Sequence, residues 1–439
     1  MGLPLLNIRH TIGGYVFCAL SPFPQFFDLA ALSYLSVTRP KDLRTLIRHI
    51  DDSPWVAFDT EFIAEKKYQP QLCLMQVAAE GAIGIIDPQT VGDLSAFWEF
   101  LCDKNREVLM HACRSELEFC YRSIGRVPER VFDVQLAAGL VGDDYPCSFA
   151  TLTEQYLQIS LPKAETRTDW SRRPLTDRQI DYALNDVRYL NPLAKKLKKR
   201  ISSLKRTRWY QSEIRETLDH LVRDFETPRW RSLSGLNNLS RRELALVREL
   251  GFWRDEQAKQ YNIPVGLLLR DDLIIELARR KSADPKRISA VRGMQRTDLT
   301  RLLPQIAAAI QCGLNCPEAE LPEVIAKQKT QQYSQMVQLL YAGLALLCHQ
   351  NGIATSLVAS QSDVRELILN RFDTANGKPS PKKVKLESGW RATIVGNFLD
   401  DLLDGKIAIC IDKTKPKSPL QFINLDGAVL PDKSQFELE

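Results

Sequence analysis

The 439-residue sequence contains no apolar run near the roughly 18 residues that a membrane-spanning helix requires. It has no large excess of either charge sign: the net charge is +5, which permits a polyanionic partner without demanding one. It also lacks a cysteine framework. Ten cysteines are scattered along the chain, and the close pair Cys312 and Cys316 has no second pair to complete a zinc site. We therefore expect reduced thiols, a cytoplasmic protein and no membrane partner.

The first 34 residues lack the features of a secretory signal. Such a signal needs a basic start and an unbroken apolar core, whereas here the apolar stretch is interrupted by Gly13, Gly14, Pro22 and Pro24. We expect an N-terminal extension, residues 1–34, that packs on the first domain or stays loose. The remaining length, at 44% hydrophobic residues overall, is enough for two or three domains with real cores.

Residues 35–208 show a mixture of strand and helix patterns. Strands are expected at "PWVAFDTEF" (54–62), "QLCLMQVAA" (71–79), "AIGIID" (82–87) and "EVLMHA" (107–112). The second and third are joined by Glu80-Gly81, a two-residue turn typical of a hairpin. Helical periodicity follows the fourth, through "SELEFCYRSIG" (115–125). The pattern predicts an α/β or α+β domain, a mixed sheet flanked by helices.

Two carboxylates lie in the middle of the first strand. Asp59 and Glu61 are two residues apart, so both point to the same face. Apolar residues on both faces around them indicate a central, largely buried strand. Buried carboxylates must be protonated, paired or metal-bound, and no basic residue lies within the strand to pair with them. A divalent ion would turn their repulsion into coordination, and oxygen ligands suit Mg²⁺ or Mn²⁺.

A second pair of polar residues lies on a well-marked helix, "PLTDRQIDYALNDVRYL" (174–190). Thr176 can serve as N-cap, with Gln179 as its capping-box partner. Tyr182 and Asp186 are four residues apart and share one face. Taken alone, the pair fits a half-buried tyrosine bonded to an aspartate. Combined with Asp59 and Glu61, it matches the carboxylates that clamp two metal ions for phosphodiester hydrolysis, with a phenol that orients the attacking water.

The rest of the chain is mostly helical. Residues 194–208 hold eight basic residues and no acid, which fits a solvated helix face and a phosphate-binding track equally well. Residues 227–313 form a helical domain in which Ser240 and Glu243 make a capping box before an apolar stripe of Leu246, Leu250 and Trp253. After the linker "CPEAELPE" a second helical domain is expected at 325–411, followed by an irregular tail, 412–439.

Four segments resemble the DEDDy 3′–5′ exonucleases, specifically ribonuclease D: "FDTEF", "HACRSELEFC", "FDVQLAAGLVG" and "ETRTDWSRRPLTDRQIDYALNDVRYL". The segment "LALVRELGFWRDEQAKQYNIPVGLLLRDDLIIELARR" is similar to an HRDC (helicase and RNase D C-terminal) domain, and the third region resembles the weaker second repeat of the same enzymes. The resemblance implies an RNase H-like fold. It also implies a monomeric enzyme that releases 5′-mononucleotides from the 3′ ends of structured RNA, with transfer-RNA precursors as the expected substrate.

The resemblance assigns the first motif to Asp59 and Glu61 and the last to Tyr182 and Asp186. The middle motif usually has an Asp five residues after a His, and counting from His111 leads to Glu116, a departure from the pattern. The resemblance thus implies two divalent ions held by Asp59, Glu61, Glu116 and Asp186, with Tyr182 as the fifth catalytic residue. It makes Asp133, in "FDVQ", a structural residue at a strand–helix junction.

Several other residues could contact substrate, although each has an ordinary alternative. Gln76 could bind the terminal nucleotide or be a satisfied core amide, and His111 could be a strand-end histidine bonded to the backbone. Lys163 and Arg173 could hold phosphates or lie at the surface. The basic run offers Lys195, Lys196, Lys198 and Lys199. Two rival functions remain: a DNA exonuclease of the same chemistry, because contacts to the 2′-hydroxyl leave no motif, and a catalytically impaired RNA-binding scaffold, favoured only by Glu116.

Overall fold

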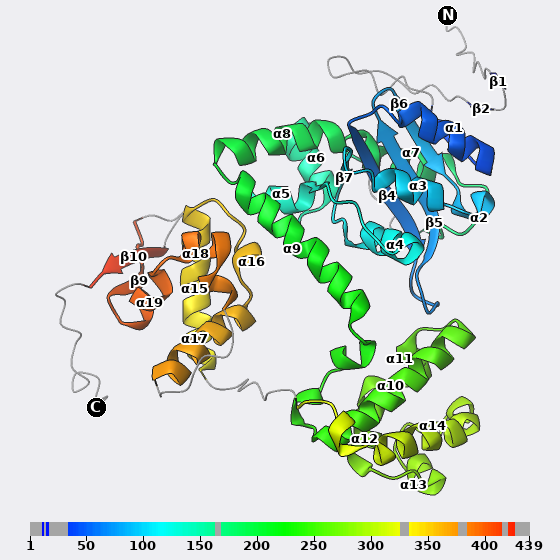
Figure 1. The fold of residues 1–439 in the computed structure, drawn as a ribbon. Helices are drawn as coiled ribbons and strands as arrows, with labels where there is room; N and C mark the ends of the chain where they lie inside the picture. The colour runs from blue at the N-terminus through cyan, green and yellow to red at the C-terminus, as the bar shows by residue number, and fades with distance from the viewer. Residues whose placement is uncertain are drawn as a thin grey trace, which may run out of the picture. The chain divides into compact units, whose positions relative to one another are not determined.

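The computed structural model describes residues 11–12, 15–16, 34–162, 168–324, 333–375, 384–414 and 420–425. Most of the predicted N-terminal extension, Lys163 and most of the predicted tail lie outside these ranges. The chain divides into two compact units, whose helices and strands are labelled in Figure 1. The first contains residues 1–132, 161–191 and 215–329, and the second contains 133–160, 192–214 and 330–439. No helix among the described residues is long and apolar enough to cross a membrane.

The first unit is built on the predicted mixed sheet. Its six strands lie in the order β3-β6-β5-β4-β7-β8. They span Leu35–Val37 (β3), Trp55–Ile63 (β4), Gln71–Ala79 (β5), Ala82–Ile86 (β6), Glu107–Met110 (β7) and Val131–Asp133 (β8). β3 runs parallel to β6 and β7 runs parallel to β4, whereas β4, β5 and β6 are antiparallel neighbours. The predicted hairpin turn is present, with Gly81 at φ +74°, a conformation that glycine adopts without strain.

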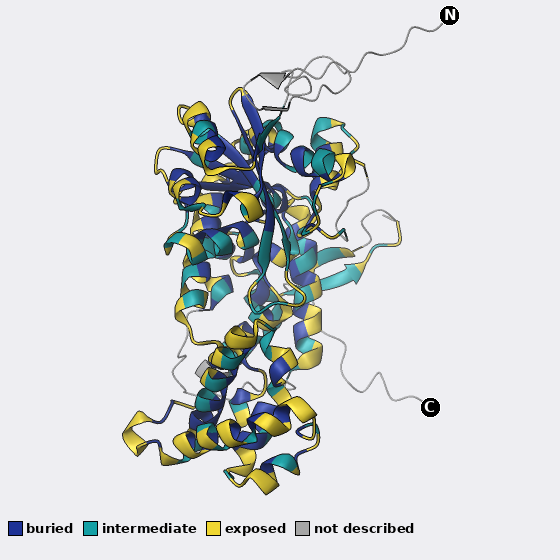
Figure 2. Ribbon diagram, turned by 90° about the vertical axis from the view of Figure 1, so that its right-hand side faces the viewer, coloured by how far each residue is buried: buried dark blue, intermediate teal, exposed yellow. Residues whose placement is uncertain are grey.

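Helices cover both faces of this sheet. α3 (Ser95–Leu101) packs with both α1 (Pro40–Ile50) and α4 (Arg114–Ile124), and α4 also packs on β4. Phe58 of β4 points to this side, because its ring contacts Trp98 of α3 at a centroid distance of 5.6 Å. Strand side chains alternate, so Asp59 and Glu61 point to the other face. α7 (Asp177–Arg188) packs across β4, β5 and β6. The strands are largely buried (Figure 2), as the apolar residues on both faces of β4 predicted.

The helical part of the first unit has a core of its own. It begins within α9 (Thr207–Glu226) and continues through α10 (Arg241–Tyr261), α11 (Val265–Leu268), α12 (Asp271–Arg280), α13 (Pro285–Ser289) and α14 (Thr297–Asn315). The predicted capping box of Ser240 and Glu243 starts α10, and Leu246 and Leu250 are fully buried. α10 packs on α14 at Gly313, where a Cβ atom would come within 2.8 Å of the Leu246 backbone.

The second unit joins three separate segments of the chain. α5 (Val134–Leu140), α6 (Phe149–Leu157) and most of α8 (Leu190–Ser203) group with α15 (Ser334–Gln350), α16 (Thr355–Val358), α17 (Gln361–Ala375), α18 (Gly389–Val395) and α19 (Phe398–Leu403). Arg206, in the middle segment, connects the other two. Its buried guanidinium donates to the carbonyls of Leu140 and Gly352 over 2.8 and 2.6 Å. The second unit therefore includes parts of the predicted 35–208 domain. The boundaries of that domain remain predictions.

The C-terminal end of the described chain differs from the sequence prediction. We expected helix to residue 411 and an irregular tail beyond it, but β9 (Ile407–Ile411) and β10 (Leu420–Asn424) form an antiparallel pair. The Pro- and Lys-containing composition of the tail favoured irregular structure. Each strand is only five residues long, and its hydrogen bonds come from the other strand, so the local pattern gave little signal.

Candidate active site

The β4–β5 register places the two strand carboxylates beneath α7. Asp59 pairs with Gln76 and Glu61 pairs with Leu74 across the antiparallel ladder. A β-bulge follows, because the register shifts between Glu61 and Phe62. Bulges re-aim side chains and are frequent beside active sites. This one ends the regular pairing directly after the second carboxylate.

Helix α7 brings the other two predicted residues to the same face. Its predicted capping box is present: the Thr176 hydroxyl accepts from the Gln179 backbone, and the Gln179 side chain accepts from the Thr176 backbone. Ligand oxygens of Asp59, Glu61 and Asp186 all lie within 4.8 Å of one another. Residues more than 120 positions apart in the sequence thus form one carboxylate cluster.

The cluster is electrostatically strained in the absence of a cation. Burial raises the pKa of Asp59 to about 7. Burial, together with the charges of Asp59, Asp186 and Glu116, raises the pKa of Glu61 to about 9. Burial and the charge of Asp59 also raise the pKa of Asp186, whereas the hydrogen bond from Tyr182 lowers it by a smaller amount. No basic side chain contributes to these three shifts among the described residues, so the donor set fits hard divalent cations.

Tyr182 completes the group as a neutral phenol. Burial first, then the charges of Asp186, Glu61 and Asp59, raise the pKa of its hydroxyl above the usual value. The hydroxyl therefore keeps its proton at neutral pH and donates a hydrogen bond to Asp186. Its ring lies 6.0 Å from that of the buried Trp170, a contact that limits how the phenol can move.

Glu116 lies near the cluster but is not part of it. It is buried in the first turn of α4 and accepts a hydrogen bond of 2.9 Å from the hydroxyl of Thr60. Thr60 points to the face opposite Asp59 and Glu61. Among the described residues, the group of mutually close ligand atoms does not include Glu116. Its charge nevertheless raises the pKa of Glu61, so a role for Glu116 at a metal remains a prediction.

The other predicted substrate contacts differ in accessibility. Arg173 binds Asp87 through Nε and Nη2, at 2.6 and 3.0 Å, and also donates to the Cys73 carbonyl over 2.7 Å. These contacts hold the segment before α7 against β5. His111 is partly exposed immediately before α4, and Gln76 is completely buried. A substrate role for each remains a prediction.

The basic run divides into an outward and an inward part. On α8, Leu193, Leu197 and Ile201 are buried, whereas Lys195 and Lys199 are exposed. Other members have protein partners: Lys196 donates to the Tyr156 carbonyl and Arg200 to its hydroxyl, and Arg206 is buried as described above. Only the outward part of the run is available for phosphates.

Thr60 and Trp170, which contact predicted site residues, were not singled out as functional from the sequence, and Asp133 was left out of the metal site. Asp133 was expected to be structural, and it is the N-cap of α5, where its carboxylate accepts from Gln135 and Leu136. Thr60 was passed over because a threonine between two strand acids carries no signal of its own. Trp170 was not singled out because no local sequence pattern marks its contact with Tyr182. Their partners, Glu116 and Tyr182, come from other elements.

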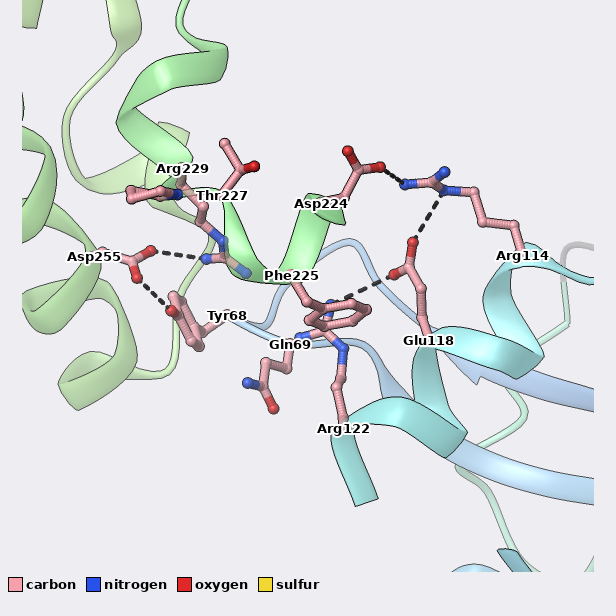
Figure 3. Close-up of a pocket in the computed structure, with 11 residues that line it drawn as sticks. Tyr68, Gln69, Arg114, Glu118, Arg122, Asp224, Phe225, Thr227, Arg229 and Asp255 are labelled. Atoms are coloured by element: carbon pink, nitrogen blue, oxygen red, sulfur yellow. Dashed lines mark hydrogen bonds and ion pairs between the residues drawn. The ribbon is translucent and has the colours of Figure 1, made fainter. Parts of the chain in front are cut away.

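A separate polar pocket of about 450 Å³ lies within the first unit (Figure 3). Tyr68, in the β4–β5 loop, donates to Asp255 of α10 over 2.9 Å, and Arg229 contacts the same carboxylate at 2.8 Å. On α4, Arg114 reaches Asp224 at 2.7 Å. The pocket is lined by three arginines and three acids: Arg114, Arg122 and Arg229 with Glu118, Asp224 and Asp255. Because these charges balance, the pocket indicates no particular ligand. The hydrogen bond from Tyr68 to Asp255 holds the β4–β5 loop against α10.

Two family models match the chain. Residues 34–202 match "3'-5' exonuclease", and residues 243–310 match "HRDC domain". The first segment includes all five predicted catalytic residues, and the second covers the helical core of α10 to α14.

Curated relatives extend the match to most of the chain. The ribonuclease D of Bartonella henselae is 31% identical over 383 residues, which cover 86% of this chain and 92% of that protein. The ribonuclease D of Desulfotalea psychrophila is 30% identical over 371 residues, which cover 82% of this chain and 96% of that protein. A crystal structure of Escherichia coli RNase D, described as an exoribonuclease involved in structured RNA processing, superposes with a TM-score of 0.72 at 26% identity and covers 85% of this chain and 99% of that one.

Proposed function

The chain belongs to the ribonuclease D family of 3′–5′ exoribonucleases, and we propose that it trims the 3′ ends of structured RNA, transfer-RNA precursors among them, with two divalent ions, Mg²⁺ or Mn²⁺. The observation that supports this most directly is the carboxylate cluster. Three partly buried acids from β4 and α7 bring their oxygens within 4.8 Å of one another. The exonuclease domain of this family is metal-dependent, and the number and identity of the ions are part of the proposal.

Asp59, Glu61 and Asp186 would hold the ions, with Glu116 contributing to the more weakly bound one. Ions bound in this way lower the pKa of a water and stabilise charge on the phosphorus. Tyr182 supplies a neutral hydroxyl beside Asp186 that orients the attacking water, and the raised pKa of this phenol keeps the hydroxyl protonated. Burial of the cluster beneath α7 limits competing water and strengthens each electrostatic contact.

The substrate is nucleic acid, and we infer RNA with a structured body. HRDC domains bind nucleic acid, and the exposed lysines of α8 offer further contacts to phosphates. We further propose that the enzyme acts as a monomer in the cytoplasm. The described cysteines are free thiols, in keeping with a reducing compartment.

The test is digestion of an RNA hairpin with a single-stranded 3′ tail, labelled at the 3′ end, beside the DNA hairpin of the same sequence. With Mg²⁺ or Mn²⁺ the RNA should release labelled 5′-mononucleotide, and EDTA or Asp59→Ala should abolish release. Equal or faster release from the DNA would favour the DNA exonuclease. Intact RNA binding without release under any metal condition would favour the scaffold.

A further inference from the structure

The side chain of Gln76, in the centre of β5, is buried and makes no hydrogen bond to any described residue. It is 0% exposed, and neither Oε1 nor Nε2 has a partner within the part of the chain that the structure describes. A primary amide can donate two hydrogen bonds and accept two. An unmet group of this kind carries the full desolvation cost of burial, so its presence in a core points to a role at a functional site, where a bound ion or water changes which partners it has.

The strand register identifies where that partner binds. Gln76 lies directly opposite Asp59 on one side and Ile85 on the other. Directly opposite residues of antiparallel strands project to the same face with neighbouring Cβ atoms. α7 packs over this face, and its residues Ala183 and Leu184 are buried. The amide therefore lies in the layer between sheet and helix, beside the Asp59 carboxylate, with apolar Ile85 on its other side.

We propose that Gln76 is a positioning residue of the metal site, whose Nε2 donates to an Asp59 carboxylate oxygen, directly or through one water, when divalent ions are bound. A carboxylate that ligates a metal keeps lone pairs that the metal does not use, and donors to these lone pairs fix its orientation. Asp59 is partly buried between the buried residues Phe58 and Thr60, and the Thr60 backbone is one donor to its carboxylate. The inference rests on the proposed metal-dependent function and adds the residue that orients its central carboxylate.

The same geometry argues against direct contact between Gln76 and a nucleotide. β4 and β6 flank it within the sheet, and α7 covers it. A base could reach the amide only if this helix moved away, and Tyr182 and Asp186 would move with it. Gln76 thus acts through Asp59 and not on the substrate.

The experiment measures binding of Mn²⁺ to the full chain without RNA, by titration calorimetry, and so needs no catalysis. Gln76→Leu removes both polar atoms, and Gln76→Met keeps the length of the side chain. Either should weaken Mn²⁺ binding about tenfold or more, the loss typical of outer-shell partners. Ile85→Leu, which alters packing beside Gln76 but no polar atom, is the matched control and should bind within about twofold of wild type.

Thermal unfolding in EDTA separates this role from a structural one. An amide without a partner in the ion-free state should be replaceable by an apolar group at no cost, so Gln76→Leu or Gln76→Met should unfold at or above the wild-type temperature. Unchanged Mn²⁺ affinity in both variants would overturn the inference. If these variants were also less stable than wild type, the amide would have a structural role. Absence of Mn²⁺ binding in wild type would instead overturn the metal-dependent function itself.

Discussion

Thr60 of β4 and Glu116 of α4, 56 positions apart, are joined by a buried hydrogen bond of 2.9 Å from the threonine hydroxyl to the carboxylate. Thr60 lies between Asp59 and Glu61 but points to the opposite face. The bond therefore fixes α4 to the strand that carries the two acids. It also explains how Glu116 can influence Glu61 without joining the cluster of ligand oxygens.

Thr60→Val should destabilise the fold and raise the metal requirement. Valine has nearly the same shape but cannot donate to a buried carboxylate, and loss of a hydrogen bond to a charged group costs about 1.5–3 kcal/mol. Denaturant unfolding measures the first effect, and rate against Mg²⁺ concentration measures the second. Thr153→Val, which removes a buried hydroxyl bonded to a backbone carbonyl away from the site, should lower stability but leave the metal curve unchanged. If both variants give the same metal curve, the bond has no part in ion binding.

The protein should be an active enzyme although it has Glu116 where the family motif usually has Asp. Glu116→Asp should remain active, and Glu116→Gln should raise the Mg²⁺ concentration for half-maximal rate, because it removes a negative charge that lies close enough to act on Glu61 and would attract an ion bound there. Mn²⁺, which is less strict about geometry, should restore more of the Gln variant's rate than Mg²⁺ does. Rate curves against both metals for the three proteins provide the measurement. Three superimposable curves would exclude Glu116 from the site.

Tyr182→Phe should slow hydrolysis while RNA affinity is retained. The variant keeps the ring contact with Trp170 and loses only the hydroxyl that donates to Asp186. Positioning and proton-transfer groups contribute about 10²–10⁴-fold, so single-turnover rates should fall within that range. Affinity is read on the same RNA in Ca²⁺. A wild-type rate in the Phe variant would remove the hydroxyl from the mechanism.

The ion-free protein should lose stability as the pH rises. The folded-state pKa values of Asp59 and Glu61, about 7 and about 9, lie above their ordinary values of 3.8 and 4.5. Between these limits the folded state holds more protons than the unfolded state, so unfolding free energy falls as pH increases through the window. Glu61→Gln cannot ionise and should flatten this decline, with its largest advantage near pH 9 and none near pH 4. Denaturant midpoints in EDTA at several pH values test the prediction, and parallel curves for the two proteins would contradict it.

The exposed lysines of α8 should contribute to the salt dependence of RNA binding. Each phosphate contact on single-stranded RNA adds about 0.7 to the slope of log affinity against log salt. Lys195→Gln with Lys199→Gln should therefore flatten the slope by up to about 1.4. Lys41→Gln with Lys104→Gln, at two exposed positions elsewhere, changes net charge equally and is the control. Equal slopes in both double variants would make the α8 face an ordinary solvated surface.

The sequence determined most of what lies within single elements. The two-residue period of β4 set Asp59 and Glu61 on one face, and the capping box of α7 started the helix that sets Tyr182 and Asp186 on one side. The family match extended this to the order of domains. These features are local, because the repeat of a strand or helix fixes which side chains share a face before any packing occurs.

Only the tertiary structure decided which faces meet. α7 covers the Asp59 face of the sheet, whereas α4 covers the other, and this choice gave Glu116 its bond to Thr60 in place of a position in the cluster. Packing also left the Gln76 amide beside Asp59 without a hydrogen bond to any described residue, and it buried Arg206 of the basic run. The physical reason is common to these cases: burial and hydrogen bonding depend on partners that are distant in sequence, and no local pattern encodes which partner arrives.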